Sequence, residues 1–323
     1  MGKVVVTGGR GFVGSHLVEH LLKNTDLEIV VFDKLGYASI ALEDIDIWNE
    51  QKERVTFYAL DLNLPVPEMV AHEIGDVRYI LHLAAESHVD NSITDPVPFV
   101  LNNVHATLSM LEYARVCKPE IFVNFSTDEV YGPAPVGTCF KEFDWHRPSN
   151  PYAASKSAQE AIGIAYSNTY GVPVVTTHTM NIFGERQHHE KFVPLVIDKV
   201  LSGEKVTIHG DKEGNSGSRM YLHARNLSGA LLHILNLGYH GYDEWNIAGL
   251  REVTNLELAQ MIADEIGNPL HYEVVDFHSS RPGHDLRYAL DSTKLIDSGY
   301  VYPVGFEESL QRTVAWTVAR GWK

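Results

Sequence analysis

Cysteine is nearly absent from this sequence, with two in 323 residues. Cys117 and Cys139 lack the spacing of a metal-binding motif, and two thiols do not make a disulfide framework. We therefore expect a protein of the reducing cytoplasm.

Long apolar runs are absent as well. No segment reaches the roughly 20 apolar residues that span a bilayer. The opening MGKVVVTGG has no charged region followed by an apolar core, so we expect no signal peptide. Internal repeats and low-complexity segments are also missing. The length of 323 residues allows either one large globular domain or two lobes.

Positive charge is scarce. Lysine and arginine number 26 against 42 aspartates and glutamates, which gives a formal charge of -16 and a pI near 5.4. An acidic protein without a basic stripe is disfavoured as a nucleic-acid binder, and it repels anionic membranes. Any anionic ligand must therefore be held by a local basic or amide-lined site.

Short β-branched runs alternate with helical patterns in the first half of the chain. This alternation predicts an α/β fold, a Rossmann-like doubly wound parallel sheet with right-handed crossovers. The expected strands are Val4–Val6, Ile29–Phe32, Val55–Leu60, Tyr79–Leu83, Phe122–Ser126 and Val174–His178. The expected helices between them are Phe12–Leu22, Phe99–Val116 and Ala153–Tyr170.

After Gly184 the loops lengthen, and charged, glycine-rich stretches such as GDKEGNSGSR (Gly210–Arg219) appear. We expect residues 1–180 to form the cofactor domain and residues 181–323 a smaller C-terminal substrate-binding lobe. Asn226–Leu237 and Trp245–Ile247 read as another helix and strand. The segment around 222–248 is therefore expected to return to the first sheet.

A glycine motif joins the first expected strand to the first helix, in TGGRGFVGSHL. Gly8, Gly11 and Gly14 would allow a tight turn and let the backbone approach a pyrophosphate, which the helix N-terminus would bind together with Phe12 and Val13. The alternative is a plain tight turn. The strand–turn–helix context favours a dinucleotide site.

Asp33 follows the second expected strand, 19 residues beyond Gly14. A carboxylate there accepts hydrogen bonds from both ribose hydroxyls and repels a 2′-phosphate, so NAD is favoured over NADP. An ordinary solvated loop aspartate is the alternative. Asp61 and Leu62 close the third strand, where they could cover the adenine.

A tyrosine and a lysine in NPYAASK, Tyr152 and Lys156, share one face of a helix because they are four residues apart. A nearby ammonium and an oxidised nicotinamide ring would both favour the phenolate of Tyr152. Tyr152 could then accept a proton from a sugar hydroxyl while hydride leaves the same carbon, with Thr127 fixing that hydroxyl. The alternative is a surface Tyr–Lys pair.

Two neighbouring carboxylates, Asp128 and Glu129, follow Thr127 in FSTDEVYG. Such a pair is often a solvated loop or the first turn of a helix. Here it stands at the end of a sheet strand, where open α/β sheets bind ligands. Elimination of water needs a base for a carbon-bound proton and an acid for the leaving hydroxyl, and two carboxyl groups with different pKa values can divide that work.

Taken together, these motifs resemble the extended short-chain dehydrogenase/reductase superfamily and, within it, the dTDP-glucose 4,6-dehydratases. The resemblance runs almost from end to end. Its markers are TGGRGFVG, DKLGYA, HLAAESHVDNSI, STDEVYG, NPYAASK, EKFVPLVI and RPGHDLRYALD.

The resemblance implies the order of events. Hydride passes from the sugar 4-position to NAD, with Tyr152 as base and Thr127 and Lys156 assisting. Glu129 then removes the proton at position 5, and Asp128 protonates the departing 6-hydroxyl. The hydride returns to position 6, so NAD need not dissociate. It also implies a homodimer, formed through the Phe99–Val116 and Ala153–Tyr170 helices.

The resemblance assigns further contacts residue by residue. The cofactor would also touch Lys34, Leu83, Ala84, Ala85, Ser87 and Ser126. The nucleotide sugar would contact Ser87, His88, Asn181, Glu190, Lys191, Arg219, Asn255, Arg281 and His284. Arginine suits this role because its planar fork binds two phosphate oxygens at once. Arg281 and His284 could instead form a surface turn around Pro282-Gly283.

Three segments depart from the family pattern. The Gly210–Arg219 loop is longer than usual, Met220-Tyr221 follows Arg219 where the family has Asp-Trp, and Phe183-Gly184-Glu185-Arg186 replaces Tyr-Gly-Pro-Tyr. We expect all three to lie where the nucleotide base and sugar are selected. A UDP-sugar therefore remains an alternative substrate.

Three other functions stay open: a UDP-sugar dehydratase, an NAD-dependent epimerase or decarboxylase of the same superfamily, and a non-catalytic NAD-binding scaffold or sensor. We expect no metal site, because His188-His189 has no third ligand at a matching spacing and reads as a solvated pair.

Overall fold

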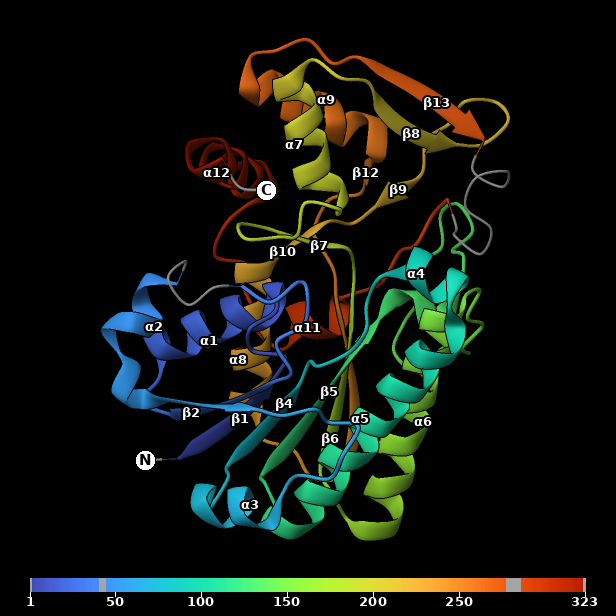
Figure 1. The fold of residues 1–323 in the computed structure, drawn as a ribbon. Coiled ribbons are helices and arrows are strands. Elements are labelled where there is room, and N and C mark those ends of the chain that lie inside the picture. The colour runs from blue at the N-terminus through green and yellow to red at the C-terminus, as the bar shows by residue number, and fades with distance from the viewer. Residues whose placement is uncertain (1, 41–44, 277–285, 322–323) are drawn as a thin grey trace.

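The central feature of the computed structural model, which describes residues 2–40, 45–276 and 286–321, is a seven-stranded parallel sheet (Figure 1). The strand order is β11-β6-β5-β4-β1-β2-β3, so the order reverses between β1 and β4. The strands are β1 (Lys3–Thr7), β2 (Glu28–Asp33), β3 (Val55–Ala59), β4 (Tyr79–His82), β5 (Ile121–Thr127), β6 (Val174–Thr179) and β11 (Tyr242–Ile247). This confirms the predicted Rossmann-like sheet and all six strands expected in the first half.

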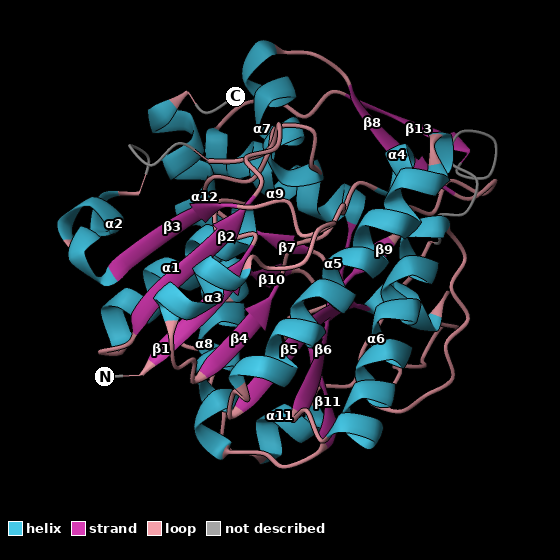
Figure 2. Cartoon of the chain, turned by 60° about the horizontal axis from the view of Figure 1, so that its bottom comes forward, coloured by secondary structure: helices cyan, strands magenta, loops and turns pink. Residues whose placement is uncertain are grey.

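Consecutive side chains of a strand point to opposite faces of the sheet, and two separate cores result. Val4 and Val6 face one layer, which contains α1 (Phe12–Asn24), α2 (Asp46–Glu50), α8 (Ala224–Leu237) and α11 (Thr293–Asp297). Val5 faces the other, which contains α3 (Glu68–Ile74), α5 (Pro96–Cys117) and α6 (Pro151–Tyr170). Figure 2 shows these layers on either side of the sheet.

The chain returns to the sheet late, as expected for residues around 222–248. Strand β11 pairs in parallel with β6, with Trp245 opposite Thr177. Helix α8 packs on α1 through Leu227 and Leu231.

The remaining elements gather above the carboxyl ends of the strands (Figure 1). Their core joins α7 (Phe192–Ser202), α9 (Asn255–Ile266) and α12 (Phe306–Arg320) around Phe183, Val196 and Ile262. The short strands here are β7 (Ile182–Phe183), β8 (Val206–Gly210), β9 (Ser218–Arg219), β10 (Leu222–His223), β12 (Val253–Thr254) and β13 (Tyr272–Asp276). Of the residues described, no helix combines the length and apolar character needed to cross a membrane.

Candidate active site

The glycine loop lies between β1 and α1, at the edge where the strand order reverses. Gly8 has a φ of 68°, and a Cβ there would lie 3.1 Å from the backbone of Ala84. A Cβ on Gly14 would lie 2.1 Å from the carbonyl oxygen of Gly8, so α1 packs too tightly on the loop for any side chain. The N-cap Gly11 contributes no side-chain acceptor, which leaves the first-turn N–H groups of α1 to an anion.

Asp33 is fixed at the end of β2, beside this loop. One carboxylate oxygen accepts a hydrogen bond from the Arg10 backbone N–H at 3.0 Å. The other accepts from the Leu35 N–H at 2.8 Å and the Ser39 hydroxyl at 3.3 Å. Asp33 is buried, so it is no solvated loop residue.

The other residues predicted for the cofactor lie along the same edge. Leu83 and Ala84 follow β4, and their N–H groups donate to the Thr7 hydroxyl at 3.1 and 3.0 Å. Leu62 is buried beyond β3, next to the more exposed Asp61. The structure thus places the predicted cofactor residues of four strand ends on one edge, together with Lys34, Ala85, Ser87 and Ser126.

The two carboxylates follow β5 in a 3-10 turn, η3 (Asp128–Tyr131). Thr127 caps this turn by accepting a hydrogen bond from the Glu129 N–H at 3.4 Å, and its hydroxyl donates to Asp128 Oδ1 at 2.9 Å. Glu129 Oε2 accepts from the Asn150 side chain at 2.8 Å. Because Asn150 also caps α6, it ties Glu129 to the helix that carries Tyr152.

Asp128 has the electrostatic character of an acid. Burial, followed by the negative charge of Glu129, raises its pKa to about 7, against opposing effects of Arg219 and the Thr127 hydrogen bond. Its Oδ2 atom is buried and has no hydrogen-bond partner among the described residues. A carboxyl group in this position can hold a proton near neutral pH and donate it.

Tyr152 and Lys156 lie on one face of α6, in its first turns, as predicted. The phenolate of Tyr152 that we expect beside an ammonium and an oxidised nicotinamide stays a prediction, because the structure describes the chain alone. Burial and the charges of Glu129 and Asp128 raise its pKa, and only a hydrogen bond with Thr127 opposes them. Burial lowers the pKa of Lys156 to about 8, and Glu160 opposes this effect. The positive charge needed to ionise Tyr152 must therefore come in part from a ligand.

Three buried polar residues around this site were missed by the sequence analysis. Asn103 on α5 accepts from the Glu86 N–H at 2.7 Å and donates to the Ser155 hydroxyl at 2.8 Å, which joins the loop after β4 to α6. Glu160 lies one turn beyond Lys156 on α6, and it pairs with His178 of β6. Only the four-residue spacing from Lys156 could have pointed to Glu160.

The expected sugar-binding residues from two distant segments come together. His88 Nε2 lies 3.7 Å from a carboxylate oxygen of Glu190, and the Lys191 ammonium donates to the Ser87 carbonyl at 3.4 Å. Asn181 is exposed just after β6, and its carbonyl accepts from the Leu222 N–H.

Arg219, on β9, lies close enough to η3 for its charge to oppose the rise in the pKa of Asp128. Its guanidinium lies over the Tyr288 ring at 4.6 Å and donates to the Leu286 carbonyl at 2.7 Å. Asn255 begins α9 and accepts from the hydroxyl of Tyr221, one of the residues that depart from the family pattern. Arg281 and His284 lie outside the described residues.

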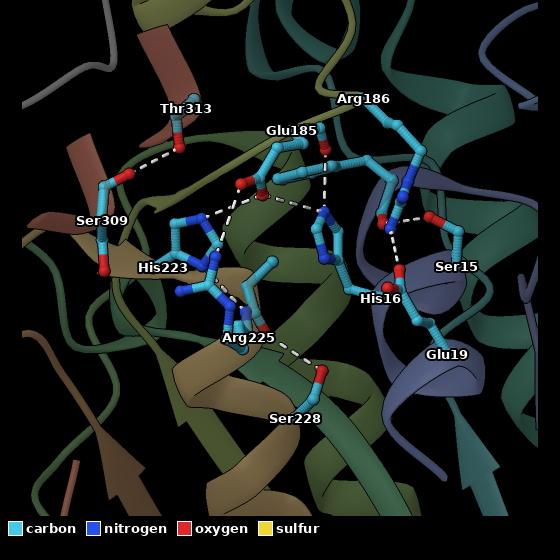
Figure 3. Close-up of polar contacts among 12 residues, drawn as sticks. Ser15, His16, Glu19, Glu185, Arg186, His223, Arg225, Ser228, Ser309 and Thr313 are labelled. Carbon is cyan, nitrogen blue, oxygen red and sulfur yellow. Dashed lines mark hydrogen bonds and ion pairs between the residues drawn. The ribbon is translucent and has the colours of Figure 1, made fainter. Parts of the chain in front are cut away.

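Glu185 and Arg186, in one of the three segments that depart from the family pattern, pair with residues of α1, β10 and α8. Figure 3 shows them between α1 and α8. Glu185 is 3.1 Å from His223 Nε2 and 3.4 Å from the Arg225 guanidinium, and Arg186 pairs with Glu19 of α1 at 2.6 Å. Their side chains therefore connect α1 with β10 and α8.

His188 and His189 do have a neighbouring acidic group, which the spacing argument overlooked. Glu190 lies 3.5 Å from His188 Nδ1, and the three residues present their ligand atoms within 4.8 Å of one another. All three are partly or fully exposed.

Over residues 4–248 the sequence matches the NAD dependent epimerase/dehydratase family. The chain belongs to this family. It is 34% identical to the dTDP-glucose 4,6-dehydratase of Escherichia coli, over 97% of this chain and 93% of that protein.

Solved structures agree with this assignment. DesIV, a dTDP-glucose 4,6-dehydratase from Streptomyces venezuelae with NAD and TYD bound, has a TM-score of 0.88 and 34% identity, over 99% of this chain and 98% of that one. A UDP-N-acetylglucosamine 4-epimerase from Methanobrevibacter ruminantium, in complex with UDP-N-acetylmuramic acid, has a TM-score of 0.86 and 27% identity, covering 99% of each chain.

Proposed function

We propose that this protein is an NAD-dependent nucleoside diphosphate-glucose 4,6-dehydratase, and that its substrate is dTDP-glucose. The observation that carries the proposal is Asp128. It is a buried carboxyl group with a pKa raised to about 7, one of its oxygens has no hydrogen-bond partner among the residues described, and Glu129 follows it directly. The named relatives and neighbours support the choice of reaction and nucleotide.

The residues present fit NAD. The tight Gly8–Gly14 loop and the open α1 N-terminus suit a pyrophosphate, and the fixed Asp33 carboxylate suits a ribose without a 2′-phosphate. Bound NAD would supply a hydride acceptor for the sugar 4-position, a hydride donor for position 6, and a positive ring.

We take the catalytic roles from the resemblance to the dehydratases, and the arrangement of the side chains supports them. Tyr152 accepts the 4-hydroxyl proton, and Thr127 orients that hydroxyl while Lys156 stabilises the phenolate. Glu129, held by Asn150, removes the proton at position 5, which the 4-keto group makes acidic. Asp128 donates its proton to the departing 6-hydroxyl, so water leaves as a neutral molecule.

We propose that residues 181–323, apart from the returning segment near 222–248, form a nucleotide-sugar lobe above the 1–180 domain. The substrate diphosphate and nucleoside would lie toward this lobe. Ser87, His88, Glu190 and Lys191 would face the sugar, since they already meet at one place. Arg219 would bind phosphate close to Asp128.

A related epimerase or decarboxylase is the second candidate, favoured by the likeness to the epimerase from Methanobrevibacter ruminantium. The test is incubation with dTDP-glucose, UDP-glucose and UDP-N-acetylglucosamine in parallel, followed by mass spectrometry. Loss of one water from dTDP-glucose is the expected result. Loss of water only from a UDP-sugar would refute the nucleotide assignment, and isomerisation or loss of carbon dioxide without loss of water would refute the dehydratase assignment. No binding or turnover of any of these sugars would favour the NAD-binding scaffold.

We also propose that the protein is a homodimer through α5 and α6, which lie side by side at one flank of the sheet (Figure 1). Apolar side chains are exposed on these two helices at Val97, Leu101, Val116, Ile164 and Tyr170. Sedimentation should give a dimer at micromolar concentration, and a monomer there would refute the arrangement.

A cytoplasmic location would suit the two free thiols, Cys117 and Cys139, and labelling of both in freshly lysed cells would test it.

A further inference from the structure

Glu160 is a buried acidic residue to which the proposed reaction gives no role. It lies on α6, one turn beyond Lys156 and two turns beyond Tyr152, so all three share one face of the helix. Its side chain is 1% exposed. A carboxylate in such a place destabilises the fold unless its oxygens are well partnered.

Both oxygens of Glu160 are partnered. Oε2 accepts a hydrogen bond from His178 Nε2 at 2.9 Å, and His146 Nε2 lies 3.4 Å from the same oxygen. Oε1 accepts from the hydroxyl of Ser126 at the end of β5. The opposite ring nitrogen of His178 lies 3.1 Å from the Tyr131 hydroxyl. The carboxylate is therefore fixed in position by three elements of the chain.

These partners also keep Glu160 ionised. Burial by itself would raise its pKa, but the facing His178 and the hydrogen bonds hold the pKa below its ordinary value. The pKa of His178 is raised, because the effect of Glu160 outweighs the effect of burial. An ionised carboxylate, paired with His178 on its far side, thus lies one helical turn from Lys156.

A nearby negative charge helps Lys156 to keep its proton. Lys156 is 4% exposed, and burial lowers its pKa to about 8, with Glu160 as the opposing influence. His82 also faces Lys156, but burial lowers the pKa of His82 to about 3, so its ring is neutral and offers no negative charge. A cationic ligand near Tyr152 would make the Lys156 proton still harder to retain.

The other titratable groups around this network do not replace Glu160. Tyr131 and Tyr242 face it from η3 and β11, and burial raises the pKa of both, so they remain uncharged. Glu244 and Glu142 act on His178 and reinforce its protonation. Asp128 and Glu129 act on Tyr152 instead.

We propose that Glu160 is a positioning residue for hydride transfer, which keeps the Lys156 ammonium charged while Lys156 stabilises the Tyr152 phenolate. This inference rests on the proposed function. In the step concerned, the C4–H bond of the sugar breaks, the hydride passes to NAD, and the proton of the 4-hydroxyl passes to Tyr152.

The test isolates this half-reaction, because Asp128 would add its own pH dependence to complete turnover. A dTDP-6-deoxyglucose carries the 4-hydroxyl but has no 6-hydroxyl to lose. Its oxidation is followed by the absorbance of reduced nicotinamide, in single turnovers from pH 6 to 10. In the parent protein the rate should fall on the alkaline side as Lys156 loses its proton.

Glu160→Gln removes the charge and keeps the shape. We expect the alkaline limb of its pH–rate profile to move down by about one pH unit, which lowers the rate roughly tenfold at about pH 9 and above. Glu160→Asp should keep the parental limb because it keeps the charge. Tyr131→Phe is the matched control, since it disturbs the same network at His178 and leaves the Glu160 charge in place. A uniform loss of rate in Glu160→Gln with an unmoved limb would overturn the proposal.

Lys156→Arg provides a test that does not require Glu160→Gln to fold. Arginine keeps its proton throughout this pH range, so the alkaline limb should disappear. An alkaline limb that persists in Lys156→Arg would overturn the proposal. His146, Glu160 and His178 also present ligand atoms within 4.8 Å of one another, so stoichiometric zinc in the purified protein would overturn it as well. If the parent protein itself fails to reduce NAD, the proposed function fails rather than this inference.

Discussion

Asp128 and Glu160 are both acidic, both almost fully buried, and close to the same end of β5, yet their protonation differs. Burial and Glu129 raise the pKa of Asp128 to about 7. The pKa of Glu160 is lowered, because His178 and hydrogen bonds outweigh burial. Burial alone thus does not decide the charge of a carboxyl group. The partners decide it. Asp128 Oδ2, which has no hydrogen-bond partner in the described part of the chain, is the oxygen suited to proton transfer.

Removing the acid and the base of the proposed elimination should have the largest effect. In the Asp128→Asn, Glu129→Gln double variant, loss of water should fall by about 10²–10⁴-fold or more, because amides cannot exchange the protons involved. Mass spectrometry of the product measures this. Turnover near the parental rate would contradict the roles of both residues.

Replacing Glu160 should cause the largest loss of stability. Glu160→Gln leaves His178 without its counter-charge, so we expect a loss of roughly 3–5 kcal/mol in the free energy of unfolding. The lowered pKa of Glu160 means that its stabilisation is present above the unfolded value of 4.5 and is lost as the pH falls through the folded value. Urea unfolding at pH 7 and pH 4 should therefore differ in the size of the loss. A gain in stability at pH 7 would contradict this account.

Asp128→Asn should have the opposite sign. A rise in pKa from 3.8 to about 7 corresponds to an unfavourable contribution of at most roughly 4 kcal/mol. This contribution is absent below pH 3.8, grows up to about pH 7 and is constant above it. The variant should therefore gain more stability at pH 8 than at pH 5 in urea unfolding. Equal stability of variant and parent at pH 8 would show that the charged Asp128 carboxylate does not destabilise the folded protein.

Tyr131→Phe should have the smallest effect. It removes one hydrogen bond to the His178 ring and leaves Glu160 paired, so about 1 kcal/mol of stability should be lost. Thermal unfolding measures the difference. A loss as large as that of Glu160→Gln would mean that Tyr131, rather than Glu160, holds His178.

The contrast between Asp128 and Glu160 also marks the limit of prediction from this sequence. Asp128 stands in a motif at the end of a strand, so local pattern was enough to propose an acid. Glu160 owes its state to His178 and His146, which come from other elements, and no periodicity relates them. Likewise, the spacing of Gly8, Gly11 and Gly14 is a local pattern, and it was enough to predict the tight turn between β1 and α1. The contacts of Glu185 with His16 and His223 are long-range and went unforeseen.

The late return of β11 has a consequence for the independence of the first 180 residues. Strand β6 is buried along its whole length, and β11 covers one of its two hydrogen-bonding edges. A fragment that ends near residue 180 would expose that edge as a row of unpaired N–H and C=O groups beside apolar side chains. Such a fragment should self-associate rather than persist as a free cofactor-binding unit. The chain must therefore be synthesised to at least β11 before this edge of β6 is covered.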